Sequence, residues 1–447
     1  MRGQRIVTRH GIGPASIHID GGRITRVSDF DDVGSPSHEV LEAQHLLVLP
    51  GLVDTHVHIN EPGRTDWEGF ATATAAAAAG GITTLLDMPL NSVPATTDVR
   101  ALEKKRKAAV AQCRVDVGFI GGVVPGNAKH IRPLWDAGVF GYKCFLVPSG
   151  VDEFRNVSAN DLELALPELA ACGAVLMVHA ELSEPLERAM SALLDRDPRK
   201  YSTYVSSRPG AAETEAVKLV IDLVRKHGAR AHIVHVSAAG TIDLLREARG
   251  ADVSITAETC PHYLTIDEMD VADGATEFKC APPIRDRINR DALWAGLLDG
   301  TLDFVVSDHS PCPPERKCQD SGNFFEAWGG IASLELTQSV VWTEMRRREV
   351  DVMKIADWMA TRPARLVGLL GRKGEIHIGA DADFALVDRA ESFVVDATRL
   401  HQRHKLTPYA GRELLGKVHA TYLRGELVFA DGQLVGEARG RLLSRTA

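Results

Sequence analysis

The stretch Leu47-Val48-Leu49-Pro50-Gly51-Leu52-Val53-Asp54-Thr55-His56-Val57-His58 decides the fold of this 447-residue chain. An apolar run leads here into two histidines at the end of a predicted buried strand. Because side chains alternate along a strand, His56 and His58 point to the same side of it. Such a pair suits a divalent cation. Taken alone the pair is a weak signal, since a carbonyl or a carboxylate more often satisfies a buried histidine.

Seven more apolar runs follow, with helix-like stretches between them. They cover residues 83–88, 115–120, 139–146, 175–179, 232–236, 253–257 and 304–308. Continuous apolar runs separated by helices are typical of parallel strands buried on both faces. Eight in succession predict an α/β fold, a (β/α)8 TIM-type barrel over residues 51–370. The alanine-rich stretch 71–79 predicts a helix packed closely on the barrel and ended by Gly80-Gly81.

The two ends of the chain have short β-like stretches and neither looks self-sufficient. We therefore expect residues 1–50 and 371–447 to form one small β domain together.

Composition restricts the class of protein. With 45% hydrophobic and 25% charged residues the chain is ordinary for a globular protein. A net charge of -9 argues against a nucleic-acid partner, and the basic run 104–107 favours a solvated helix face. The seven cysteines show no CxxC pair, which is typical of a reducing compartment. The N-terminus lacks a signal-peptide core and no apolar run could span a membrane, so we expect a cytoplasmic, soluble protein without a membrane partner.

Ionisable side chains end other predicted strands as well. His179 ends the fifth, His235 the sixth and Asp308 the eighth. Functional residues of such barrels project from the C-terminal ends of the strands. Four histidines and one aspartate at one level are hard to explain as core, because buried ionisable groups that are neither paired nor metal-bound are costly. They predict a metal site.

Lys143 stands in the fourth strand, within Gly141-Tyr142-Lys143-Cys144-Phe145. A lysine at that depth is unusual. Its amine either reaches out to water or a carboxylate, or has reacted with carbon dioxide to give a carbamate. Because two cations would otherwise have few anionic ligands, charge balance favours the carbamate.

This set of residues resembles that of the cyclic amidohydrolases, the family of dihydroorotase, hydantoinase or dihydropyrimidinase, and allantoinase. The resemblance implies that His56 and His58 bind one metal with Asp308, that His179 and His235 bind the other, and that Lys143 bridges them as N6-carboxylysine. It implies two divalent ions per chain, with Zn²⁺ favoured over Co²⁺, Fe²⁺ or Mn²⁺, all of which these ligands tolerate. It also implies a homo-oligomer, a tetramer in the family.

The reaction expected from these ligands is hydrolysis of a cyclic amide. Two cations lower the pKa of a water held between them to about 7, and the hydroxide attacks the ring carbonyl. By the resemblance, Asp308 is catalytic: it takes the hydroxide proton and delivers it to the departing nitrogen.

Within the family, dihydroorotases hold a substrate carboxylate with an arginine and a histidine where this chain has Asn60 and Cys312. Neither residue is cationic, so a neutral ureide fits better. Seven stretches resemble the allantoinase group specifically, namely residues 87–92, 141–145, 260–263, 279–285, 307–315, 327–332 and 403–409. They imply opening of the allantoin ring to allantoate in purine catabolism. A hydantoinase or dihydropyrimidinase is the alternative, followed by a dihydroorotase or an inactive scaffold homologue.

Substrate contacts are expected at Asn91 and, through the backbone, at Ala281 and Gly330. Asn91 is explained equally well as a residue that forms a turn. We expect Asn60 to brace the site rather than to contact the substrate. Glu213 and Glu215 are expected to form ion pairs rather than to act in catalysis. The chain departs from the family pattern at Ala281, where relatives often have Ser. By the same comparison, we expect the N-terminal stretch to lack the family's usual opening β-strand.

Overall fold

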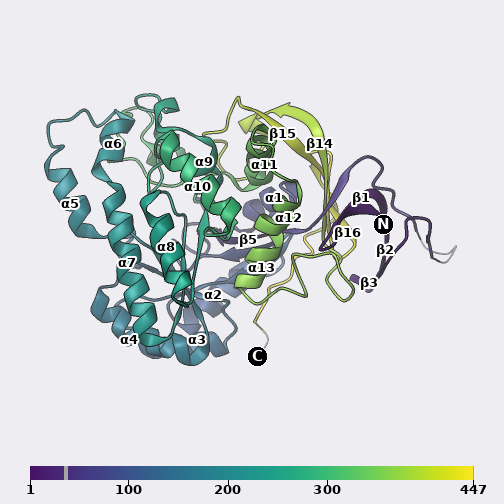
Figure 1. Cartoon of the computed structure of the whole chain (residues 1–447), viewed down its shortest axis with the longest axis horizontal. Helices are drawn as coiled ribbons and strands as arrows, with labels where there is room; N and C mark the ends of the chain where they lie inside the picture. The colour runs from purple at the N-terminus through teal and green to yellow at the C-terminus, as the bar shows by residue number, and fades with distance from the viewer. Residues whose placement is uncertain (35–38, 446–447) are drawn as a thin grey trace.

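The structure, a computed structural model, describes residues 1–34 and 39–445. The barrel strands are β5 Leu52–Val57, β6 Ile82–Asp87, β7 Asp116–Phe119, β8 Gly121–Gly122, β9 Tyr142–Phe145, β10 Val175–His179, β11 Arg230–Ile233, β12 Ile255–Thr259 and β13 Phe304–Val305. They lie in the helix-rich part of the molecule, beside a separate sheet that contains the N-terminus (Figure 1).

The strands close into one ring of parallel strands. They pair in the orders β5-β6-β7 and β8-β9-β10-β11-β12-β13. Only Ile120 separates β7 from β8, so these two are one barrel strand with two partners. A parallel bridge between Val57 and His309 joins the last strand to the first, with His58 N donating to His309 O at 2.8 Å. The predicted eight-stranded barrel is confirmed.

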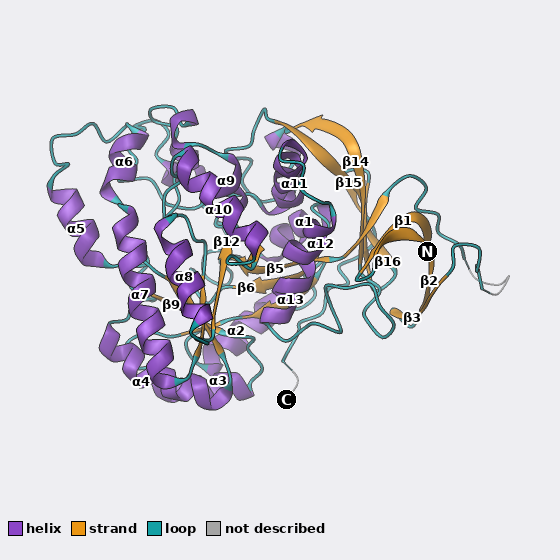
Figure 2. Ribbon diagram, viewed as in Figure 1, coloured by secondary structure: helices purple, strands orange, loops and turns teal. Residues whose placement is uncertain are grey.

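Helices connect the strands and cover the outside of the barrel (Figure 2). They are α1 Phe70–Ala79, α2 Val99–Ala109, α3 Ile131–Asp136, α4 Ala159–Cys172, α5 Ser183–Ser191, α6 Tyr201–Ser207, α7 Gly210–His227, α8 Gly240–Gly250, α9 Pro261–Thr265, α10 Arg287–Asp299, α11 Thr337–Arg347, α12 Met353–Ala356 and α13 Arg362–Leu366. The alanine-rich stretch is helix α1, ended by Gly80 as predicted. Among the described residues, no helix has both the length and the apolarity needed to cross a membrane.

The basic run 104–107 is not wholly solvated, which corrects the sequence interpretation. Lys105 is fully buried, and its Nζ lies 2.7 Å from Asp87 Oδ2 and donates to Met88 O at 2.7 Å. The other oxygen of Asp87 accepts from Ile59 N at 2.9 Å. The local charge pattern could not reveal this pair, because Asp87 lies on the preceding strand.

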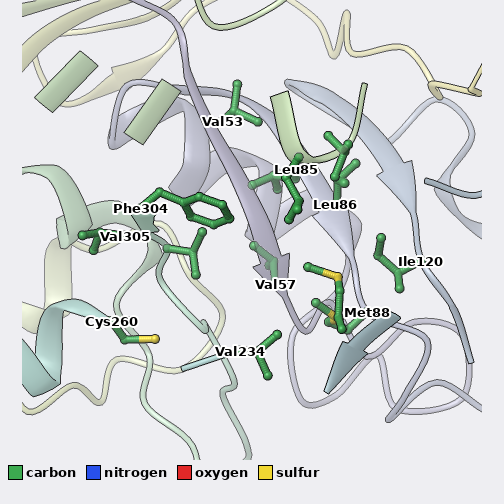
Figure 3. Packing of buried hydrophobic residues seen from close by; sticks show 14 of the residues in the cluster. Val53, Val57, Leu85, Leu86, Met88, Ile120, Val234, Cys260, Phe304 and Val305 are labelled. Atoms are coloured by element: carbon green, nitrogen blue, oxygen red, sulfur yellow. The ribbon is translucent and has the colours of Figure 1, made fainter. Parts of the chain in front are cut away.

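Buried apolar side chains from successive barrel strands pack closely together (Figure 3). Val57 of β5, Leu86 of β6 and Phe304 of β13 are at most 1% exposed. Burying such a side chain stabilises the fold by about 1.5–3 kcal/mol. This close-packed core holds the C-terminal ends of the strands in fixed positions.

Both chain ends build one eight-stranded sheet, which confirms the predicted small β domain. Its order is β17-β16-β15-β14-β4-β1-β2-β3. The strands are β1 Arg2–Thr8, β2 Gly11–Asp20, β3 Arg23–Ser28, β4 Leu47–Pro50, β14 Phe384–Val394, β15 Glu413–Leu423, β16 Glu426–Ala430 and β17 Gln433–Leu434. Strand β1 opens the chain, so the expectation that an opening strand is missing was wrong.

The stretch 47–58 therefore contributes one strand to each of two sheets. Strand β4 pairs with β14, whereas β5 begins the barrel, and Gly51 lies between them. A Cβ at Gly51 would lie 2.2 Å from Thr83 Oγ1, so only glycine fits this close approach. At the other end, residues 441–443 run beside β7, with Val117 N donating to Arg441 O at 2.9 Å. The division at residues 50 and 370 stays a prediction.

Three strand ends differ from the sequence prediction. Strand β11 stops at Ile233 and β13 at Val305, so His235 and Asp308 lie in the loops that follow. Both adopt left-handed backbone conformations, with φ of 41° and 45°, which turn the chain out of the strand. Strand β12 runs to Thr259, two residues past the predicted end, and so includes Glu258.

Candidate metal centre and active site

A cavity of about 680 Å³ opens at the C-terminal ends of the barrel strands. All six predicted ligands line it: His56, His58, Lys143, His179, His235 and Asp308. They come from five different strands or the loops directly after them. The barrel thus brings together side chains that are up to 252 positions apart in the sequence.

His56, His58 and Asp308 form one donor group. Asp308 Oδ1 lies 3.3 Å from His56 Nε2 and 3.5 Å from His58 Nε2. One donor atom from each of the three residues lies within 4.8 Å of the others, and all three residues are buried. Imidazole nitrogens and a carboxylate oxygen at this spacing are the donors that a divalent cation prefers.

His179 and His235 form a second donor group beside the first. His179 Nδ1 lies 3.0 Å from His235 Nε2, and the rings of His235 and His56 are 5.5 Å apart. Burial, and then the neighbouring His179, lowers the pKa of His235 well below its usual 6.5. Neutral imidazoles keep the lone pair that a metal needs.

Lys143 lies between the two groups. Its Nζ is 3.4 Å from His56 Nε2, and the side chain is fully buried. Burial lowers the pKa of Lys143 from its usual 10.5 to about 8. The neutral amine, the form that can react with carbon dioxide, is therefore accessible near neutral pH.

Two buried glutamates hold the histidines, and the sequence prediction missed both. Glu258 Oε1 accepts from His56 Nδ1 at 2.6 Å, and its Oε2 lies 3.0 Å from His232 Nε2. Glu181 Oε2 lies 2.8 Å from His179 Nε2 and pairs with Arg208. Such carboxylates fix the ring orientation of metal-binding histidines and raise their basicity. Glu258 could have been found as an acid at a strand end, had that strand been extended by two residues.

Replacing Glu258 should weaken metal binding. In Glu258→Gln, the amide oxygen can accept a hydrogen bond from only one of His56 and His232, and the other histidine loses its carboxylate partner. The affinity for metal should therefore fall by about 10–100-fold. Competition with a chelator measures this, with the exposed Glu247→Gln on α8 as the matched control. Metal retention equal to that of the control would show that Glu258 does not support the site.

The predicted substrate-binding residues lie at the same cavity. Asn91 lines it, and its Nδ2 donates to Asn60 Oδ1 at 3.0 Å. Asn60 in turn lies 3.4 Å from Pro311 O, which fits the bracing role expected of it. Neither asparagine is charged. The cavity lining does include basic side chains, among them Lys279 and Arg316.

The backbones of Ala281 and Gly330 differ in which hydrogen-bonding groups remain available to a substrate. Ala281 lines the cavity, and the described residues offer its backbone N–H no hydrogen-bond acceptor. Gly330 N donates to Lys279 O at 2.8 Å, and Gly330 O accepts from the buried ammonium of Lys317 at 2.5 Å. A Cβ at Gly330 would lie 2.2 Å from Ser310 O, so the close approach requires glycine. Only the second lone pair of the Gly330 carbonyl is left for a substrate.

The ion pair expected at Glu213 is present. Its carboxylate accepts from Ser237 N and Ala238 N, each at 3.0 Å, and pairs with Arg285 at 2.6 Å. Glu213 thereby fixes the loop that carries His235. Glu215 is exposed and lies 3.9 Å from Arg188.

The donor set fits divalent metal ions. His58 Nδ1 and His235 Nδ1 are buried without a hydrogen-bond partner among the described residues. Non-glycine residues with positive φ, at Asn60, His235 and Asp308, gather at the same place. Strained backbone and unpaired nitrogens concentrated around one set of donors are typical of a functional site rather than of core packing.

Comparison with known proteins agrees with this geometry. Residues 47–428 match the model of the Amidohydrolase family. A relative from Streptomyces avermitilis named allantoinase is 47% identical, covering 100% of this chain and 98% of the relative, and one from Arabidopsis thaliana with that name is 40% identical over 98% and 89%.

Solved structures show the same fold. The L-hydantoinase (dihydropyrimidinase) from Arthrobacter aurescens superposes with a TM-score of 0.94 at 30% identity, covering 99% of both chains. The dihydropyrimidinase from Brevibacillus agri gives 0.90 at 28% identity, covering 100% of this chain and 99% of the other. With its barrel, its terminal sheet and its donor cluster, the chain belongs to the amidohydrolase family.

Proposed function

We propose that the protein is an allantoinase, which hydrolyses the cyclic amide of allantoin to give allantoate in purine and ureide catabolism. The observation that carries the proposal is a complete set of six donors lining one cavity beside the uncharged Asn60 and Asn91. The full-length similarity to relatives named allantoinase supports it.

In the proposed site, His56 and His58 hold one cation together with Asp308, and His179 and His235 hold a second. Lys143, as N6-carboxylysine, bridges them, which converts a buried cation into an anion. When bound, the two ions supply a water of lowered pKa and polarise the amide carbonyl. Zinc is the ion we favour, because its preferred ligands are nitrogen and carboxylate oxygen, while Co²⁺, Fe²⁺ and Mn²⁺ suit the same donors.

Asp308 moves the proton in this proposal. Its carboxylate faces the cavity, within 3.5 Å of two histidines, and accepts the proton of the attacking water. The same carboxylate returns the proton to the ring nitrogen as the amide bond breaks. The Ala281 backbone, Asn91 and the Gly330 carbonyl orient the ureide ring from the cavity wall.

A hydantoinase or dihydropyrimidinase activity is the second candidate, because the solved structures above carry those names. Purified protein assayed on allantoin, hydantoin, dihydrouracil and dihydroorotate separates the two. We expect the highest kcat/KM on allantoin and none measurable on dihydroorotate, whose carboxylate meets Asn60 in place of a cation. Opening of dihydrouracil without opening of allantoin would contradict the proposal.

Formation of the carbamate should depend on pH. Burial lowers the pKa of Lys143 to about 8, and only the neutral amine attacks carbon dioxide. At a fixed concentration of dissolved CO2, reactivation of the metal-free protein should therefore speed up about tenfold per pH unit below about pH 8 and level off above it. A rate that keeps rising toward the ordinary lysine pKa of 10.5 would contradict a lowered pKa at this amine.

The proposed setting is the cytoplasm, and the proposed assembly is a homo-tetramer. All seven cysteines are free thiols, which fits a reducing compartment. The family resemblance is the basis for the tetramer, and sedimentation of the metal-loaded protein tests it.

A further inference from the structure

His262 is a fully buried histidine whose ring lacks partners. It lies in α9, directly after β12, and neither ring nitrogen has a hydrogen-bond partner among the described residues. The ring packs against Tyr263, with 4.2 Å between centroids. A buried polar group left unpaired in this way needs an explanation, such as local strain, a catalytic role, a bound water or a bound ion.

Two further donors face the same point. A ring nitrogen of His262, the thiol of Cys260 and a carboxylate oxygen of Asp308 all lie within 4.8 Å of one another. All three residues are buried, and among the described residues neither ring nitrogen of His262 has a hydrogen-bond partner. Cys260 directly follows β12 and belongs to the cluster of buried apolar side chains (Figure 3). One thiol, one imidazole and one carboxylate are donors that bind zinc and softer ions of the same charge.

We propose that Cys260, His262 and Asp308 form an additional, inhibitory site for Zn²⁺ or Cd²⁺, separate from the six-donor centre but sharing Asp308 with it. A cation would enter from the cavity, which Asp308 lines. The thiol releases its proton to solvent as the metal–sulfur bond forms. Asp308, now bound on this side as well, can no longer accept the proton of the attacking water, and hydrolysis stops.

The metal site itself stands on the three donors alone, and only its inhibitory effect rests on the proposed function. The six proposed donors include no sulfur, so a cadmium–thiolate absorption band does not come from the catalytic centre. Because Cys280 and Cys318 also line the cavity, the part of the band that Cys260→Ser removes is what reports the additional site. The band and the metal count also need no substrate. A protein that shows both but does not open allantoin would contradict the proposed function and leave the additional site supported.

The test titrates the metal-loaded protein with Cd²⁺ and follows three readouts: metal content per chain, the ultraviolet cadmium–thiolate band and hydrolysis of allantoin. We expect one further ion per chain, with the band and the loss of activity rising together. In Cys260→Ser and in His262→Gln, the cadmium concentration needed for inhibition should rise by on the order of tenfold or more. Cys113→Ser is the matched control, because Cys113 is also buried but belongs to none of the clusters of possible metal donors among the described residues.

Each result decides the proposal. Loss of the band in Cys260→Ser but not in Cys113→Ser supports it. A wild-type protein that takes up no further ion, or one whose band and inhibition persist unchanged in Cys260→Ser, overturns it. If Cys260→Ser does not fold, His262→Gln gives the same decision, since removing that donor must also weaken inhibition.

Discussion

Lys143→Ala is expected to abolish opening of the allantoin ring, with a loss of activity of more than about 100-fold. Replacing a residue that only supports a metal ligand already lowers activity by up to about 100-fold, and Lys143 is itself a proposed ligand. Lys143 lies 3.4 Å from His56 Nε2, between the two histidine groups, with no exposed surface. Without its carbamate, the proposed centre loses the anion that bridges its two halves. kcat on allantoin and metal content per chain measure the effect.

Short carboxylic acids such as formate, acetate and propionate should partly restore the activity of Lys143→Ala, because a carboxylate can occupy the space and supply the charge of the carbamate. Lys143→Arg is the control. It keeps the positive charge but forms no carbamate, and its larger side chain leaves no room for the acid. Full activity of Lys143→Ala without any added acid would overturn the bridging role.

Asp308→Asn should lower kcat by about 10²–10⁴-fold, the usual contribution of a positioned proton acceptor. The amide keeps an oxygen toward His56 and His58 but cannot accept the proton of the attacking water. The metal content should consequently fall far less than kcat does. Steady-state kinetics together with elemental analysis separate these two effects.

The matched control for Asp308 is Glu326→Gln, which removes an exposed carboxylate from the lining of the same cavity. Its kcat is expected to stay close to that of the wild type. If Asp308→Asn with a normal metal content kept kcat within a few-fold of the control, Asp308 would be a ligand only.

Five of the six donors could be proposed from the sequence because they stand at or just after the end of an apolar run, and Lys143 because a lysine inside such a run is unusual. The rule that links strand ends to barrel sites needs no knowledge of which strands are neighbours. His235 and Asp308 lie beyond their strands, yet the rule still found them, because they stand only two and three residues after the strand ends at Ile233 and Val305. The terminal sheet was also predictable in outline, from two chain ends that could not bury their apolar faces alone.

What could not be predicted are contacts that join distant segments. Glu258 supports His56 across 202 positions, and the placement of its strand was wrong by two residues. Lys105 looked solvated because its partner Asp87 lies on another element. Likewise, nothing in the local sequence showed that Lys317 donates a hydrogen bond to the Gly330 carbonyl. Each of these depends on the three-dimensional arrangement of the chain, which local charge and periodicity do not contain.

The most direct test of the central claim is the rate of allantoate formation as metal-free protein is loaded stepwise with Zn²⁺ in the presence of CO2. The two donor groups around Lys143 predict that hydrolysis of allantoin rises with metal content and reaches its maximum at about two ions per chain. A protein that holds two ions per chain and leaves allantoin unopened, or one fully active without metal, would contradict the account.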